Sequence, residues 1–171
     1  MLLEIRSAPH SRESIHLMAT IRRASESDIP EMVAVVNAAF QVERDFRDSD
    51  RTSPAETSRL MQSSTFFVAI NDGRIAGAVQ VRVNGTTGYF GMLAVDPTLQ
   101  RSGLGRMLRE AAEIYCREQG CTEMTLSTGS VRRELLSYYR KFGYEITSIE
   151  PAPEAAPFSK TIEIVRMAKP L

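Results

Sequence analysis

The sequence predicts a mixed α/β fold in one domain, and three observations support this prediction. Some segments repeat apolar residues at helical spacing, whereas others are short and rich in β-branched and aromatic residues. Two turn signals, NDG at 71–73 and NGTTG at 84–88, separate three of the strand-like segments and predict an antiparallel meander. A strand, a helix and a strand then follow in order, which predicts a parallel, right-handed crossover.

The start of the chain predicts one strand and two helices. The alternating segment 19–25 is a short strand by its pattern. Ser27 is expected to cap a helix over 27–40, and Ser53 with Pro54 at the first position predicts a second helix. One face of the first helix carries most of its apolar residues: Ile29, Met32, Val33, Val36 and Phe40.

The rest of the chain alternates between strands and helices. The expected elements are strands at 65–70, 74–83 and 89–95, a helix from 104 that stops at Gly120, a strand at 121–128, a helix at 132–142 that stops at Gly143, and strands at 144–150 and 160–168. A proline-rich loop at 151–159 separates the last two strands.

Composition narrows the classes of function. The chain has 21 Lys and Arg against 21 Asp and Glu, so no global field favours nucleic acid or an anionic membrane as the main partner. Cys116 and Cys121 are expected to be reduced thiols. His10 and His16 are the only histidines and both lie near the start, so a metal site or a Ser-His-Asp site is not expected.

The 171 residues fit one domain. Residues 1–17 show no clear period and are expected to be a disordered extension, with the domain over 18–171 and Met18 as the natural start. Neither a membrane helix nor the apolar region of a signal peptide is predicted, so a cytoplasmic location is expected.

The stretch from 101 to 106, RSGLGR, lies at the junction between an expected strand and an expected helix. A helix N-terminus leaves about four backbone N–H groups unpaired and carries a positive dipole end. Gly103 and Gly105 permit close approach, while Arg101 and Arg106 add positive charge, which together predict a phosphate site. The alternative is a plain helix start, but two glycines in a first helical turn cost about 1 kcal/mol each relative to alanine.

These residues also carry a family resemblance. The run QRSGLG, 100–105, matches the Q/R-x-x-G-x-G/A signature of the GCN5-related N-acetyltransferase (GNAT) family. SYYRKFGYE at 137–145 resembles that family's FYxKxGF segment, and MAKPL at 167–171 resembles its MxKxL ending. The order of elements agrees, so the resemblance covers about residues 18–171.

The resemblance implies a GNAT-like fold and transfer of acetyl from acetyl-CoA to a primary amine. The sheet would be mostly antiparallel, splayed between its fourth and fifth strands and flanked by about four helices. The implied coenzyme-binding residues are Leu93, Ala94 and Val95 on the fourth strand, and Arg101, Ser102, Gly103, Leu104, Gly105 and Arg106 in the loop. No metal is implied. Family members are often dimers, so a homodimer is among the expected partners.

Tyr139 matches the family tyrosine that protonates the departing thiolate. Val131, Leu135, Tyr138 and Phe142 form one helical stripe, which assigns Tyr138 to packing and leaves Tyr139 just off the stripe. Packing in the core is the alternative role for Tyr139.

The sequence leaves open which residue acts as the general base. The expected strand YFGMLAV has no acid, so the hypotheses are Glu123 on the next strand and the cluster of Glu43 and Asp45 after the first helix. The helix 1–helix 2 region shapes the substrate site in the family, which favours Glu43. Ordinary solvated charge is the alternative for all three.

The leading functional hypothesis is an N-acetyltransferase acting on a small or amino-acid-like amine in a ternary complex. A protein or peptide amine is the second acceptor class. The competing hypotheses are an acyl-CoA sensor without catalysis and a plain structural α/β domain.

Overall fold

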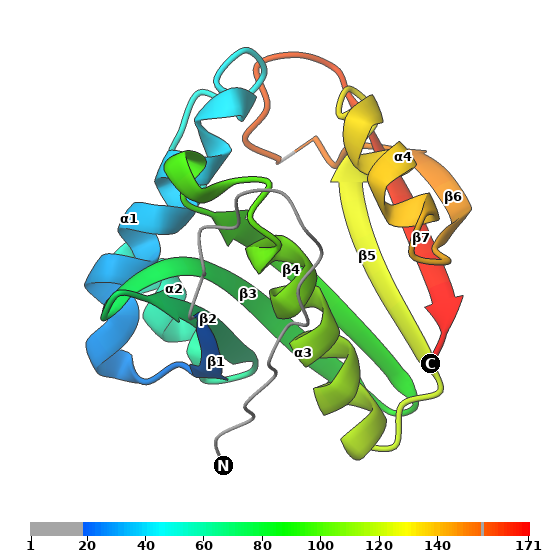
Figure 1. Ribbon diagram of the computed structural model, residues 1–171. Coiled ribbons are helices and arrows are strands. Elements are labelled where there is room, and N and C mark those ends of the chain that lie inside the picture. The colour runs from blue at the N-terminus through cyan, green and yellow to red at the C-terminus, as the bar shows by residue number, and fades with distance from the viewer. Residues whose placement is uncertain (1–18, 155) are drawn as a thin grey trace.

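The computed structural model describes residues 19–154 and 156–171, so the expected extension over 1–17 lies outside the described residues. Seven strands form one sheet in the order β1-β2-β3-β4-β5-β7-β6 (Figure 1). The elements are β1 (Thr20–Arg23), η1 (Glu26–Asp28), α1 (Ile29–Ala39), η2 (Phe40–Glu43), α2 (Pro54–Met61), β2 (Thr65–Asn71), β3 (Arg74–Asn84), β4 (Thr87–Val95), η3 (Pro97–Leu99), α3 (Leu104–Glu118), β5 (Glu123–Gly129), α4 (Arg133–Arg140), β6 (Glu145–Pro151) and β7 (Glu163–Pro170), where η marks a short 3₁₀ helix.

The predicted fold class is confirmed. Every neighbouring pair in the sheet is antiparallel except β4 and β5, which are parallel. The β4–β5 ladder is short: Thr87 to Tyr89 pair with Glu123 to Thr125, and the ladder goes no further. Beyond it the two strands diverge toward the top of Figure 1, where α3 begins.

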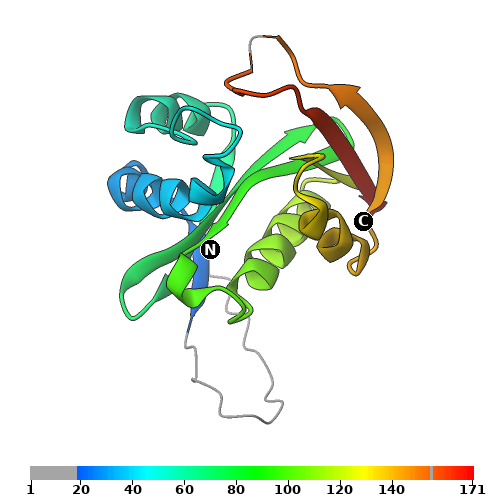
Figure 2. The same ribbon diagram turned by 90° about the horizontal axis from the view of Figure 1, so that it is seen from above.

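Helices cover both faces of the sheet. The helices α1 and α2 lie on one face, and α3 with α4 lies on the other (Figure 2). One stripe of α3 has no solvent exposure and packs against the sheet: Leu104, Leu108, Ala112 and Cys116. The glycines of the sheet let α3 approach closely, since a Cβ at Gly88 would lie 2.5 Å from the Cys116 sulfur. Cys116 and Cys121 are buried and not disulfide-bonded, and burial raises the pKa of Cys116 to about 12.

The start of α1 differs from the expected Ser27 cap. The helix begins at Ile29 after the short turn η1, and Ser25 precedes that turn. The Asp28 carboxylate accepts a bond from the Ser25 backbone N–H at 2.8 Å and two bonds from Arg22 at 2.7 Å. The Asp28 carboxylate thus joins the start of α1 to β1 and to the residue before η1. The other expected cap is confirmed: Ser53 accepts from the Glu56 N–H.

A buried ionic cluster fastens α3 to the last strand. Glu113 accepts hydrogen bonds from Arg109 at 2.6 Å and from the Tyr144 hydroxyl at 2.8 Å, and it pairs with Lys169 at 2.9 Å. The Arg109 guanidinium also lies 3.9 Å from the centre of the Phe142 ring. Burial acts to raise the pKa of Glu113, but the bonds from Lys169, Tyr144 and Arg109 outweigh it, and the pKa lies below its ordinary 4.5.

We expect Glu113→Gln to reduce the free energy of unfolding at pH 7 by about 3–5 kcal/mol, because it leaves Lys169 without a counter-charge and leaves the buried Arg109 with only Glu110, at 3.6 Å. A lowered carboxyl pKa adds stability that is complete above the unfolded value and is lost as the pH falls through the folded value. The variant should therefore lose less stability on acidification than the native protein. Urea unfolding between pH 3 and 7, a range of about four units around the ordinary value, measures both effects.

Glu110→Gln is the matched control, since Glu110 lies on the same helix, is less buried, and pairs mainly with the exposed Arg106 at 2.7 Å, with Arg109 farther away at 3.6 Å. It should change stability by less than about 1 kcal/mol. Equal losses in the two variants would contradict the role given to Glu113.

Candidate active site

A cavity of about 690 Å³ opens where β4 and β5 diverge. Its walls come from the end of α1 with η2, from β4, β5 and α4, and from the loop between β6 and β7. The floor includes Leu93 and Val95 of β4, two of the residues expected to bind a coenzyme. The third, Ala94, is buried among the side chains that pack under α1, so only its backbone is near this region.

A bulge interrupts β4 at the cavity. Ala78 of β3 pairs with Ala94 and Gln80 pairs with Gly91, so Met92 and Leu93 together face the single residue Val79. Met92 has a φ of 48°, a left-handed conformation that is rare for a residue with a long side chain. A bulge bends its strand and leaves a residue outside the ladder, and this one lies at residues that line the cavity.

The loop from β4 to α3 has a fixed backbone. Asp96 starts it by accepting bonds from the Thr98 N–H and hydroxyl, at 2.8 and 2.7 Å. Hydrogen bonds from the Thr98 side chain and backbone lower the pKa of Asp96. Arg101 and Gly103 have φ values of 64° and 93°, both in the left-handed region, so the chain turns sharply before α3. The N–H groups of the first turn of α3 then point out of the helix end.

The loop side chains have different surroundings. Arg101 and Gly105 line the cavity, whereas Leu104 is fully buried and offers only its backbone. The Ser102 hydroxyl donates to the Leu99 carbonyl within the loop. Arg106 is exposed and pairs with Glu110 at 2.7 Å. A Cβ at Gly103 would meet nothing within 4 Å, so its positive φ is what requires glycine there.

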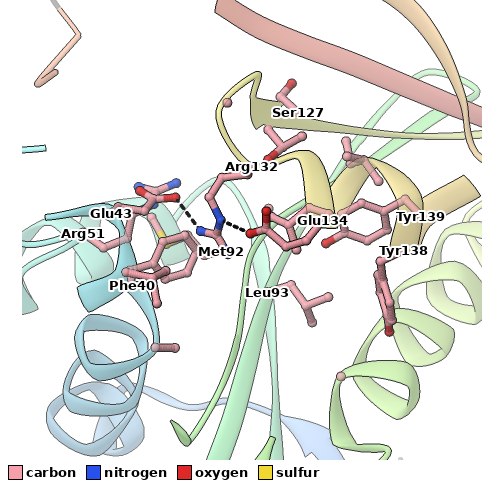
Figure 3. A pocket seen from close by; sticks show the side chains of 18 of the residues that line it. Phe40, Glu43, Arg51, Met92, Leu93, Ser127, Arg132, Glu134, Tyr138 and Tyr139 are labelled. Carbon is pink, nitrogen blue, oxygen red and sulfur yellow. Dashed lines mark hydrogen bonds and ion pairs between the residues drawn. The ribbon is translucent and has the colours of Figure 1, made fainter. Parts of the chain in front are cut away.

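Tyr139 lies between the core and the cavity. Its ring is packed 5.7 Å from Phe90 and 5.9 Å from Tyr144, centre to centre, and only 6% of the residue is exposed. It also lines the cavity, where Figure 3 shows it on the α4 side. Burial, and then the neighbouring Tyr138, raises the pKa of the hydroxyl, so Tyr139 stays protonated at neutral pH.

The stripe argument for α4 was wrong about which tyrosine is buried. Tyr138 is only partly buried; it stacks edge-on against Phe142 at 5.0 Å and lines the cavity as well. Tyr139 is the core residue, because α4 meets Phe90 and Tyr144 along the side that carries it. Tyr139 therefore packs in the core and also lines the cavity.

Glu43 lies in the wall of the cavity inside a chain of ion pairs. One of its oxygens accepts from Arg47 at 3.2 Å and the other from Arg132 at 3.3 Å. Arg132 also donates to Glu134 at 2.6 Å and so bridges the two carboxylates (Figure 3). Partial burial acts to raise the pKa of Glu134, but the hydrogen bond and charge of Arg132 outweigh it and the pKa is lowered.

The structure does not bring Glu123 to this cavity. Glu123 lies in the closed end of the β4–β5 pair, opposite Thr87, and is exposed. The sequence argument placed it on the correct strand, but the strand runs away from the site at that end. Conversely, Arg132 and Glu134 were not singled out from the sequence. The signal for them was weak: two charged residues at the start of a short helix.

Arg51 is a further residue missed from the sequence. It lines the cavity on the α1 side, and its guanidinium lies 5.2 Å from the centre of the Phe40 ring. Burial, and then the nearby Arg47, lowers the pKa of Arg51 below its ordinary value.

Neither a metal-binding cluster nor a membrane-spanning helix is found in the part of the chain that the structure describes. No three His, Cys, Asp or Glu side chains within 19–154 and 156–171 are grouped so as to hold a metal ion. In the same part of the chain, no helix has the length and apolar content to cross a membrane.

Comparison with known proteins gives a consistent result. A family model described as "Acetyltransferase (GNAT) family" matches residues 30–144. The "IAA acetyltransferase" of Azospirillum brasilense is 29% identical over 136 residues, which cover 74% of this chain and 86% of that protein.

Solved structures agree on the fold. Ard1 from Thermoplasma volcanium superposes with a TM-score of 0.74 at 22% identity, covering 90% of this chain and 97% of that one. The protein yncA from Salmonella typhimurium, solved with its cofactor acetyl-CoA, gives a TM-score of 0.69 at 19% identity, covering 90% and 94%.

Proposed function

The chain belongs to the acetyltransferase (GNAT) family and is an acyltransferase enzyme, and on that premise we propose that it acetylates the amine of a small, amino-acid-like acceptor, with acetyl-CoA as the donor. The single observation that carries this proposal is the opening between β4 and β5, with the glycine loop at one border and Tyr139 at the other. Both substrates would bind together, and transfer would be direct.

The donor would follow the edge of β4. Its pyrophosphate would accept hydrogen bonds from backbone N–H groups of residues 101–106, aided by the helix dipole and by Arg101 and Arg106. The pantetheine arm would pair with peptide groups at Leu93 and Val95, which β5 does not reach. A backbone N–H near the bulge would stabilise the oxyanion of the tetrahedral intermediate.

Tyr139 would supply a proton to the leaving group. The acceptor nitrogen attacks the thioester carbonyl, a C–N bond forms and the C–S bond breaks, and the departing thiolate takes the hydroxyl proton. A thiol has a pKa near 8.5, so it leaves more readily when it is protonated. The protonated state and the position of Tyr139 at the cavity support this role.

The amine must lose a proton before it attacks, since an alkylammonium has a pKa near 10.4. We propose Glu43 as the base, acting through water, and Glu134 as its rival. Glu43 is the less exposed of the two, whereas Glu134 has one oxygen that does not bind Arg132.

The walls of the cavity favour a small acceptor over a peptide. The segment after α1 contacts the loop between β6 and β7: Arg47 pairs with Phe158 as an isolated bridge, and the Ser159 N–H donates to the Phe46 carbonyl at 3.0 Å. These contacts join the two segments over the acceptor side, and a peptide would need an open groove there. A thiol-release assay over small amines and peptides tests this preference. Binding of acetyl-CoA with no turnover on any amine would support the sensor alternative instead.

Gly103→Glu should weaken acetyl-CoA binding by about 10-fold or more, because it places a carboxylate against the pyrophosphate and strains a left-handed position. Calorimetric titration measures this change. Gly103→Asn is the control, since asparagine tolerates this conformation and adds no charge. Equal affinity in the native protein and the Glu variant would place the pyrophosphate elsewhere.

Tyr139→Phe should lower kcat by about 10²–10⁴-fold and leave the Kd for acetyl-CoA unchanged, because only the proton donor is removed while the ring packing remains. Tyr138→Phe is the matched control on the same helix and should keep most of the activity. Steady-state kinetics with direct binding measurements separate the two. A Tyr139→Phe enzyme as fast as the native one would remove Tyr139 from the reaction.

Glu43→Gln should lower kcat/KM by about 10²–10⁴-fold and remove the acidic limb of its pH profile if Glu43 takes the proton. Glu134→Gln should keep that limb. The opposite pattern would assign the base to Glu134, and an unchanged profile in both variants would exclude this pair of carboxylates.

A further inference from the structure

On the side of the cavity away from the glycine loop, one cation has no ion-pair partner among the described residues. Arg47 and Arg132 both pair with Glu43, and Arg132 pairs with Glu134 as well. Arg51, by contrast, forms no ion pair and donates no side-chain hydrogen bond within residues 19–154 and 156–171. Three guanidiniums therefore face two carboxylates on this side of the cavity, which leaves one positive charge uncompensated.

The position of Arg51 is fixed by its neighbours in the chain. The Asn37 side chain of α1 donates to the Thr52 carbonyl at 3.0 Å and accepts from the Thr52 N–H at 3.1 Å. The buried Thr52 hydroxyl lies 3.0 Å from that of Thr57 on α2. The residue after Arg51 is thus held to both helices. A guanidinium on such a support can be presented to a ligand with little loss of conformational entropy.

The guanidinium is accessible to a ligand. Among the described residues, only Arg109 Nε is a buried side-chain atom without a partner, so the Arg51 nitrogens are not sealed in the protein. An arginine that is partly buried in a cavity and lacks a partner is costly, because the charge loses water without gaining a counter-ion. A bound anion would remove that cost.

The surroundings of Arg51 indicate the rest of the ligand. Phe40, Phe46, Met92 and Phe158 also line the cavity, and Figure 3 shows Phe40 and Met92 near Arg51. Figure 3 places Arg51 on the α1 side and Tyr139 on the opposite, α4 side, with Arg132 between them. A molecule that reached both would carry an anionic group at one end, an apolar body and an amine at the other end. Glu43 lies beside Arg51 in Figure 3, so it would take the proton of that amine through intervening water, whereas Glu134 lies nearer to Tyr139.

We propose that the acceptor is an amine bearing a carboxylate, and that Arg51 binds this carboxylate and so determines acceptor specificity. This inference rests on the proposed function and makes its substrate class specific. The planar fork of arginine matches the two oxygens of a carboxylate, and a monoanion balances the single uncompensated charge.

The test compares acceptors in which the carboxylate is replaced by a neutral amide. The amide also lowers the pKa of the amine, which by itself favours the amide, so a preference for the carboxylate is not caused by amine basicity. The pairs are phenylalanine with phenylalaninamide, 4-aminobutyrate with 4-aminobutyramide, and 6-aminohexanoate with its amide, which vary the distance between amine and carboxylate. We expect at least one carboxylate to exceed its amide by about 10- to 100-fold in kcat/KM, as a charge-assisted bond allows. The N-acetylated products, titrated into the protein saturated with coenzyme A, should show the same preference in Kd.

Two variants assign the preference to Arg51. Arg51→Gln should abolish it in both turnover and product binding, and Arg51→Lys should restore part of it. Arg44→Gln is the matched control, since Arg44 belongs to the same segment, is exposed and pairs with Asp50. It should leave the preference in place.

Each other outcome overturns the proposal in a recognisable way. If no carboxylate is acetylated faster or bound more tightly than its amide, Arg51 does not select the acceptor, while acetyl-CoA binding and turnover of any amine would leave the proposed function standing. If Arg51→Gln instead weakens acetyl-CoA binding, the guanidinium serves the donor. If neither acetyl-CoA binding nor turnover is found in the native protein, the proposed function fails first.

Discussion

The early end of the β4–β5 ladder is the constraint on which the rest of the structure depends. Parallel pairing stops at Tyr89 and Thr125, so the remainder of β4 has a neighbour on its β3 side only. Peptide groups left without partners inside a protein are costly unless water or a ligand satisfies them. The bulge at Met92 also removes one residue of β4 from the ladder with β3. The sheet therefore leaves part of the β4 edge unpaired, which is where we propose that the extended donor binds.

Two sets of contacts hold the two sides of the opening at a fixed separation. On the coenzyme side, the apolar stripe of α3 packs against the sheet, and the Glu113 cluster ties the helix to Lys169 of β7. On the acceptor side, Arg132 links the start of α4 to Glu43 after α1. Apolar packing and ion pairs thus fix both walls without closing the space between them. The glycine loop can then sit at the end of β4 with its N–H groups directed outward.

Local patterns predicted most of the fold. Helical spacing, glycine stops and the two turns located all the strands and α-helices, because each of these signals depends on neighbouring residues only. The loop at 101–106 was also visible, since two glycines and two arginines at a strand–helix junction need a reason. The prediction failed at two places. The helix α1 begins at Ile29 after the turn η1 and not at Ser27. Tyr139 rather than Tyr138 is buried, because Tyr139 packs against Phe90 and Tyr144.

The acceptor side could not be predicted for the same reason. Glu43 and Arg132 meet although they are 89 residues apart in the chain. Arg51 differs from Arg47 and Arg132 because those two arginines pair with Glu43. No local sequence pattern shows which arginines form ion pairs. Glu123 was expected near the site because its strand was expected there. That strand does border the cavity, but Glu123 lies at the end where β4 and β5 are paired.

Amide hydrogen exchange with and without saturating acetyl-CoA tests the central claim most directly. The account predicts slower exchange at residues 91–95 of β4 and at residues 101–106, because the donor supplies the partners that β5 does not. It predicts no change at Thr87 to Tyr89, which are already paired with β5. Unchanged exchange at 91–95 and 101–106 in a protein that binds acetyl-CoA would contradict the account, because the donor would then lie outside the opening.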